Sequence, residues 1–148
     1  MTPESARVLT TGLMGHRPAA KVPNTLGTFF NSDHYALDLE RGILWSTMNI
    51  AKDAMDDNGR VQAGFVTAML DNCMAMLFMA FRRGTSFNAP TLEMQTHYFH
   101  PVEATSPCHF VTRIIFLSNR VGYLEVALRQ EKLLCAKGKS TLLMKYAK

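Results

Sequence analysis

The chain has 148 residues, of which 47% are hydrophobic and 19% are charged. This length fits one domain, and the apolar fraction is large enough to bury a core, which excludes a disordered chain. The net charge is +4, and the basic residues are spread out rather than gathered into the patch typical of nucleic-acid binding. We therefore expect no nucleic-acid partner, although a modest positive field suits a polyanionic small ligand.

We expect the chain to have two parts: an N-terminal helix or loop segment, residues 1–34, and one domain that spans residues 35–148. The Pro and Gly residues of RPAAKVPNTLGTFF mark a loop. The first residues carry Glu4 and no uninterrupted apolar run, so no signal peptide is expected. From Tyr35 onward, alternating residues, an ERG turn and an extended run from Ile43 to Ile50 predict two antiparallel strands.

The segment VQAGFVTAMLDNCMAMLFMAF, residues 61–81, predicts one long and almost entirely apolar helix. Its length is that of a membrane span, but Asp71 and Asn72 lie at its centre, where a charge is costly in lipid. We therefore expect a helix enclosed by its own protein, with no membrane partner.

Four strands in meander-like succession are predicted after the helix, from TLEMQTHYFHP, CHFVTRIIFL, YLEVALRQ and LLCAKGKSTLLMKY. Strands on both sides of one apolar helix indicate an α+β fold, in which a curled antiparallel sheet of about six strands surrounds the helix. The exposed edges of such a sheet favour a dimer that extends it.

Asp71 is the one carboxylate within the apolar helix, on a stripe of small residues. Burying an unpaired carboxylate is costly, so this acid is a candidate general base or nucleophile facing a cavity. Alternatively, it braces a neighbouring loop or faces a second subunit. The helix pattern leaves both interpretations open.

The start of the helix carries small residues, at Gly59, Ala63 and Gly64. The first N–H groups of a helix are unpaired and carry the positive end of its dipole, so a carbonyl oxygen can approach them there. Small residues also favour plain packing of a helix against a sheet, which stays an alternative.

The three cysteines, Cys73, Cys108 and Cys135, lack the spacing of a metal site. We expect buried reduced thiols, a cytoplasmic location, no metal and no cofactor.

The motifs GRVQAGFVTAMLDN and PTLEMQTHYFHPV, followed by the last two strands, resemble the hot-dog-fold acyl-CoA thioesterases of the phenylacetic-acid-degradation type. The family's helix entry, N-x-x-G-x-x-H-G-G followed by L-x-D, is matched in register by Gly59, Gly64 and Asp71, with Leu70 directly before the acid. Pro101 in YFHP matches the end of the family's strand. The resemblance covers roughly residues 35–144.

The resemblance implies that Asp71 is the catalytic acid and that the N–H of Ala63, with Gly64 beside it, binds the oxyanion. It places a hydroxyl near the attacking water at Thr91. It also implies a homodimer, and a dimer of dimers, in which Asp71 faces Ala63 of the other subunit.

The chain departs from the family motif at three positions. Gln62 replaces the motif His and is expected to hold the thioester carbonyl through its amide. Ala63 replaces a Gly, and its methyl group reduces the space in which a substrate can approach the backbone. Asp56 replaces the upstream Asn and brings an acid toward the thioester.

Further substrate contacts are expected from a methionine, an amide and basic residues near strand ends that suit CoA phosphates. These are Met69, Asn72, Arg120, Lys137 and Lys139.

The predicted function is hydrolysis of a medium-chain, long-chain or aryl acyl-CoA, with Asp71 either activating water or attacking directly. A non-catalytic protein that binds acyl-CoA or an acyl carrier is the alternative. A hydratase is disfavoured because His97 and His100 face opposite ways in an extended strand, so no His–acid pair is evident.

Overall fold

The computed structural model describes residues 7–8, 30–50, 54–81 and 87–146. Most of the predicted N-terminal segment lies outside these residues, so its boundary at residue 35 stays a prediction. The elements in chain order are β1 (Arg7–Val8), β2 (Phe30–Asp38), β3 (Ile43–Ile50), α1 (Ala63–Phe81), β4 (Phe87–Asn88), β5 (Thr91–Tyr98), β6 (Cys108–Leu117), β7 (Val121–Gln130), β8 (Leu133–Leu143) and β9 (Lys145–Tyr146).

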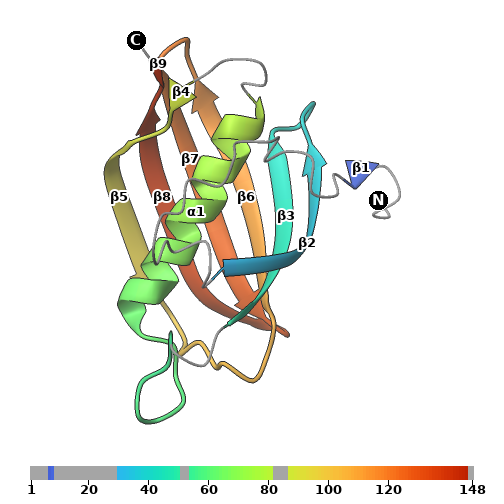
Figure 1. Cartoon of the computed structure of the whole chain (residues 1–148), viewed down its shortest axis with the longest axis vertical. Coiled ribbons are helices and arrows are strands. Elements are labelled where there is room, and N and C mark those ends of the chain that lie inside the picture. The colour runs from blue at the N-terminus through green and yellow to red at the C-terminus, as the bar shows by residue number, and fades with distance from the viewer. Residues whose placement is uncertain (1–6, 9–29, 51–53, 82–86, 147–148) are drawn as a thin grey trace, which may run out of the picture.

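One curled antiparallel sheet, in the order β1-β2-β3-β6-β7-β8-β5, lies behind helix α1 (Figure 1). Strands β4 and β9 form a separate short pair. Six long strands around one apolar helix confirm the predicted α+β class and the hot-dog fold.

The expected meander of four strands holds only for β6, β7 and β8. Strand β5 pairs with β8 rather than with β6, and β6 pairs with β3. The helix carries the chain across the sheet, so β5 forms at the far edge. Residues 99–107 then return the chain to the free edge of β3. Strand β5 is therefore an edge strand, which bears on the site.

Helix α1 packs one face onto the sheet, and eight of its residues are buried there: Val66, Met69, Leu70, Cys73, Met74, Leu77, Phe78 and Ala80. The predicted small-residue stripe is half-buried, on the side that the sheet leaves uncovered: Thr67, Ala68, Asp71, Asn72 and Ala75. By length and composition α1 could cross a membrane, but these contacts make it the core helix of the domain, as expected.

Candidate active site

Asp71 lies in the middle of α1 with its side chain half-buried. The hydroxyl of Thr91, the first residue of β5, donates to Asp71 Oδ1 at 2.7 Å. Neither of the ion pairs found within the described residues involves Asp71. A carboxylate has about four lone-pair sites, so after accepting from Thr91 it can still accept a proton from water.

Helix α1 begins at Ala63. The carbonyl of Gln62 accepts from the N–H groups of Phe65 and Val66 at 3.0 and 3.1 Å, which makes Gln62 the N-cap residue. No acceptor within the described residues is found for the N–H groups of Ala63 and Gly64. The first turn contains no acidic residue, so the positive end of the helix dipole is not neutralised there.

Gly64 lies beside open space. A Cβ atom at this position would meet no heavy atom of the described residues within 4 Å. Packing against the sheet, the alternative explanation for small residues at the helix start, therefore does not account for Gly64.

A cavity of about 310 Å³ opens at the start of α1. Six of its eight lining residues are apolar, and the other two are Tyr98 and His100: the full set is Val61, Ala63, Val66, Tyr98, Phe99, His100, Pro101 and Val102. The hydroxyl of Tyr98 donates to the carbonyl of Ala63 at 3.0 Å and is also hydrogen-bonded to the hydroxyl of Thr67. Neither Tyr98 nor His100 was predicted as a site residue. The only local signal was their place in YFHP.

Gln130, at the end of β7, holds the wall of this cavity in place. Its buried amide donates to the carbonyls of Glu103 and Ser106 at 2.6 and 2.7 Å and accepts from the N–H of Glu103 at 2.8 Å. The N–H of Val61 in turn donates to the carbonyl of Val102 at 2.9 Å. The loops on both sides of the helix start are thus tied to each other and to the sheet.

Asp56 shapes the loop that leads into the helix. Its Oδ1 accepts from the N–H groups of Asn58 and Arg60, both at 2.9 Å, and the turn between them is completed by Gly59 at a φ of 74°. These hydrogen bonds give the carboxylate of Asp56 a structural role that requires no substrate. The expected contact of Asp56 with substrate stays a prediction.

The predicted catalytic residues fall into two groups within one protomer. Thr91 lies beside Asp71, whereas Tyr98, at the other end of β5, lies beside Ala63. Ala63 and Asp71 are eight positions apart in the helix, a rise of about 12 Å. One thioester group cannot contact both.

The remaining predicted residues are more dispersed. Met69 does not line the cavity, because it is buried in the core at 2% exposure. Gln62 is exposed and does not line the cavity either. Asn72 is half-buried, and its amide lies 3.6 Å from the sulfur of Met76.

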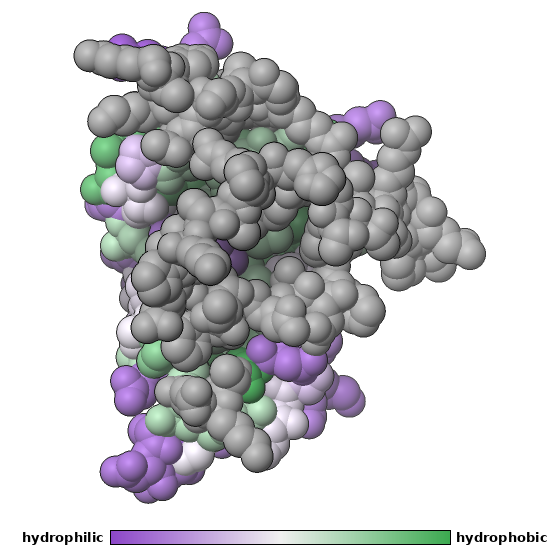
Figure 2. Space-filling view, viewed as in Figure 1, coloured by the Kyte–Doolittle hydropathy of each residue, from purple (hydrophilic) through white to green (hydrophobic). Residues whose placement is uncertain are grey.

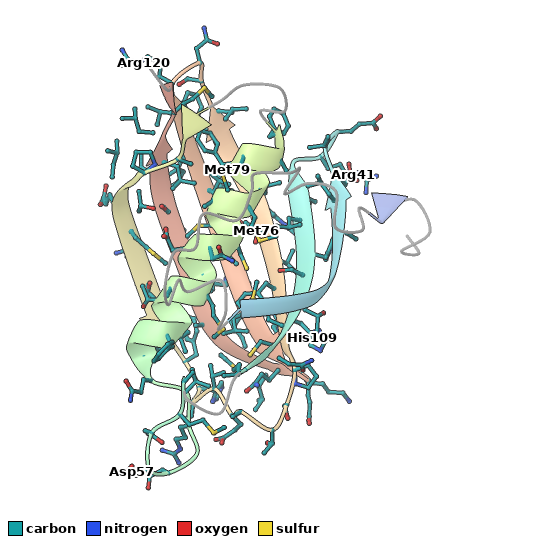
Figure 3. The ribbon with its side chains drawn as sticks, in the orientation of Figure 1. Arg41, Asp57, Met76, Met79, His109 and Arg120 are labelled. Atoms are coloured by element: carbon teal, nitrogen blue, oxygen red, sulfur yellow. The ribbon has the colours of Figure 1, made fainter. Side chains whose placement is uncertain are left out.

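The predicted basic contacts lie apart from the cavity. Arg120 lies in the turn between β6 and β7, at the opposite end of the protomer from Asp57 in the loop before the helix (Figure 3). Lys137 and Lys139 are exposed on β8, where they pair with His97 and Gln95 of β5.

Comparison with solved structures supports the same fold. A putative thioesterase, a phenylacetic acid degradation-related protein from Ralstonia eutropha JMP134, is 27% identical, with a TM-score of 0.74 over 88% of this chain and 95% of that chain. The smu.793 protein from Streptococcus mutans UA159, bound to acetyl CoA, is 14% identical, with a TM-score of 0.67 over 90% and 98%. The E. coli PaaI protein from the phenylacetic acid degradation operon is 9% identical, with a TM-score of 0.67 over 80% and 82%. No curated protein sequence matches the chain.

A curled antiparallel sheet around one central helix defines the hot-dog fold, and the carboxylate at mid-helix and the cavity at the helix start form its candidate site. The family model for the Thioesterase superfamily matches residues 58–136, which is more than half of the chain, so the chain belongs to this superfamily. It is a thioester hydrolase.

Proposed function

We propose that this chain hydrolyses the thioester bond of an acyl-CoA whose acyl group is medium-chain, long-chain or aryl. The observation that carries the proposal is the half-buried Asp71, held by Thr91 and without a cationic partner among the described residues. The resemblance to proteins described as phenylacetic acid degradation-related and as bound to acetyl CoA supports an acyl-CoA as the substrate, and the length and type of the acyl group are part of the proposal.

The site is completed by a second copy of the chain. Strand β5 is an edge strand and ends beside exposed apolar side chains, with Leu92 at 59% and Phe99 at 52% exposure. Figure 2 shows hydrophobic residues among hydrophilic ones along the margin where β5 lies in Figure 1. Such an edge is a template for pairing with another strand.

Antiparallel pairing of β5 with the partner's β5 joins the two groups of residues. The Thr91 end of one strand then lies opposite the Tyr98 end of the other. Because Thr91 contacts Asp71 and Tyr98 contacts Ala63, this pairing brings Asp71 toward the partner's Ala63. One subunit supplies the acid and the other supplies the helix dipole. Association of two such dimers stays a prediction.

In the proposed reaction, Asp71 takes a proton from water as the water oxygen attacks the thioester carbonyl. The N–H of Ala63 from the partner subunit stabilises the negative charge on the carbonyl oxygen. The C–S bond then breaks, and its electron pair leaves with the sulfur, which is protonated to the free thiol. The reaction consumes only water.

Replacement of Asp71 by Asn tests the proposal. Asp71→Asn removes the base and keeps the shape, so we expect thiol release to fall by at least about 10²-fold, at the low end of general base catalysis. Asp38→Asn, at the hairpin between β2 and β3, is the matched control and should leave the rate unchanged. Unchanged turnover in Asp71→Asn would exclude the mechanism.

The colour reaction of free thiols is a suitable measurement because the protein's own thiols are masked. Cys73, Cys108 and Cys135 are all buried and free. Burial raises the pKa of Cys73 and of Cys108 to about 12, so neither forms the reactive thiolate near neutral pH. Saturable acyl-CoA binding by the unaltered protein without thiol release would instead favour the non-catalytic alternative. A cytoplasmic location for these reduced thiols stays part of the proposal.

A further inference from the structure

The cavity at the helix start is lined by one exposed polar side chain whose ring has no hydrogen-bond partner among the described residues. Among its eight lining residues, only Tyr98 and His100 carry polar side-chain atoms. The two side chains differ in their hydrogen bonds to the rest of the protein. The inference rests on the proposed function.

The hydroxyl of Tyr98 is already engaged. A phenol has one proton, and that of Tyr98 is donated to the carbonyl of Ala63 at 3.0 Å. The contact with Thr67 must then be a bond in which Thr67 donates and Tyr98 accepts. Tyr98 therefore has no proton left for a ligand in the cavity, and its role is to fasten β5 to the first turn of the helix.

His100 is held by its backbone and not by its ring. The N–H groups of Phe99 and His100 both donate to the carbonyl of Cys135, at 2.8 and 3.2 Å, and Pro101 restricts the chain immediately afterwards. No hydrogen bond of the His100 ring to another described residue is found. An imidazole carries at least one N–H donor in either tautomer, so the ring is able to donate into the cavity.

We propose that His100 is a catalytic residue that donates a hydrogen bond to the thioester carbonyl oxygen. It acts together with the N–H of Ala63, a residue that lines the same cavity. Negative charge develops on this oxygen as water adds to the carbonyl carbon, so the two donors act together in the transition state. The role assigned to Gln62 from the family motif passes to His100, because Gln62 does not line the cavity.

Two substitutions at His100 separate a hydrogen-bond donor from a packing residue. His100→Leu removes the donor, and we expect kcat to fall about 10²-fold with KM nearly unchanged, as for the loss of one oxyanion donor. His100→Gln restores an N–H donor and should keep kcat within about tenfold of the parent. His109→Leu is the matched control, since His109 lies on β6 away from the cavity, with its Nδ1 hydrogen-bonded to the hydroxyl of Thr47, and should change kcat less than about twofold.

The outcomes distinguish this inference from the proposed function. An active parent enzyme, an inactive Asp71→Asn and an unaffected His100→Leu would overturn the role of His100 and leave the thioesterase mechanism intact. Equal losses in His100→Gln and His100→Leu would also overturn the donor role. A larger loss in Gln62→Ala than in His100→Leu would return the carbonyl contact to Gln62.

Discussion

Ala63 contributes to the site through its backbone rather than through its side chain. It is the first helical residue, and no described residue accepts from its N–H. Proline is favoured at this position because its ring fixes a helical φ and the missing N–H has no intrahelical partner. Proline at Ala63 therefore deletes one donor with little change to the helix.

Ala63→Pro is expected to lower kcat by about 10²- to 10³-fold, the usual effect of removing one oxyanion donor. The urea midpoint should remain close to that of the parent. Steady-state kinetics and equilibrium unfolding check the two expectations. A fully active Ala63→Pro enzyme would show that the oxyanion is bound elsewhere.

At the scale of elements, α1 packs closely against the sheet at Gly122 of β7, a residue without a side chain. A Cβ atom at Gly122 would lie 2.6 Å from Cε2 and 2.8 Å from Cδ2 of Phe78. Phe78 is fully buried, so its ring has no free space into which to move. Gly122 therefore sets how closely the helix approaches the sheet.

Gly122→Ala should destabilise the fold by about 1–3 kcal/mol through overpacking. Gly64→Ala is the matched control, because the added Cβ meets open space and alanine favours a helix over glycine by about 1 kcal/mol. Urea unfolding compares the two variants. Equal stabilities would contradict the tight contact between Gly122 and Phe78.

At the scale of the whole molecule, a site shared between two subunits predicts complementation between inactive chains. In a heterodimer of Asp71→Asn and Ala63→Pro, one of the two sites combines an intact Asp71 with an intact Ala63. Half of the dimers in an equal mixture are heterodimers, so about a quarter of the parental activity should return. Co-refolding of the two chains followed by a thiol-release assay measures this. A mixture as inactive as its components would overturn the shared site.

Much of the fold and part of the site followed from local patterns. Helix α1 and the six long strands, β5 included, were recognised from apolar spacing of 3.6 or 2 residues. Asp71 stood out because a carboxylate in an apolar helix is costly to bury. Thr91 was named from the family resemblance alone, and the structure places it beside Asp71.

Other features depended on contacts between distant parts of the chain. Strand periodicity does not identify a strand's neighbour, so the meander placed β5 beside β6, whereas it pairs with β8. Met69 was expected in the substrate pocket because its side chain is apolar and flexible, but it lies on the face of α1 that packs into the core. The alternation rule described His100 as a strand residue, although β5 ends at Tyr98 and His100 lines the cavity.

The physical reason for this division is the range of the interactions. Helix and strand periodicity, capping and the cost of a buried charge act over a few residues, and the chain specifies them directly. Ala63, at the start of a helix, and His100, about forty positions later, both line the cavity. Only the packing of β5 beside that helix brings the two residues together. The amino-acid sequence therefore determined the helix and the strands, whereas their packing in three dimensions decided which side chains meet.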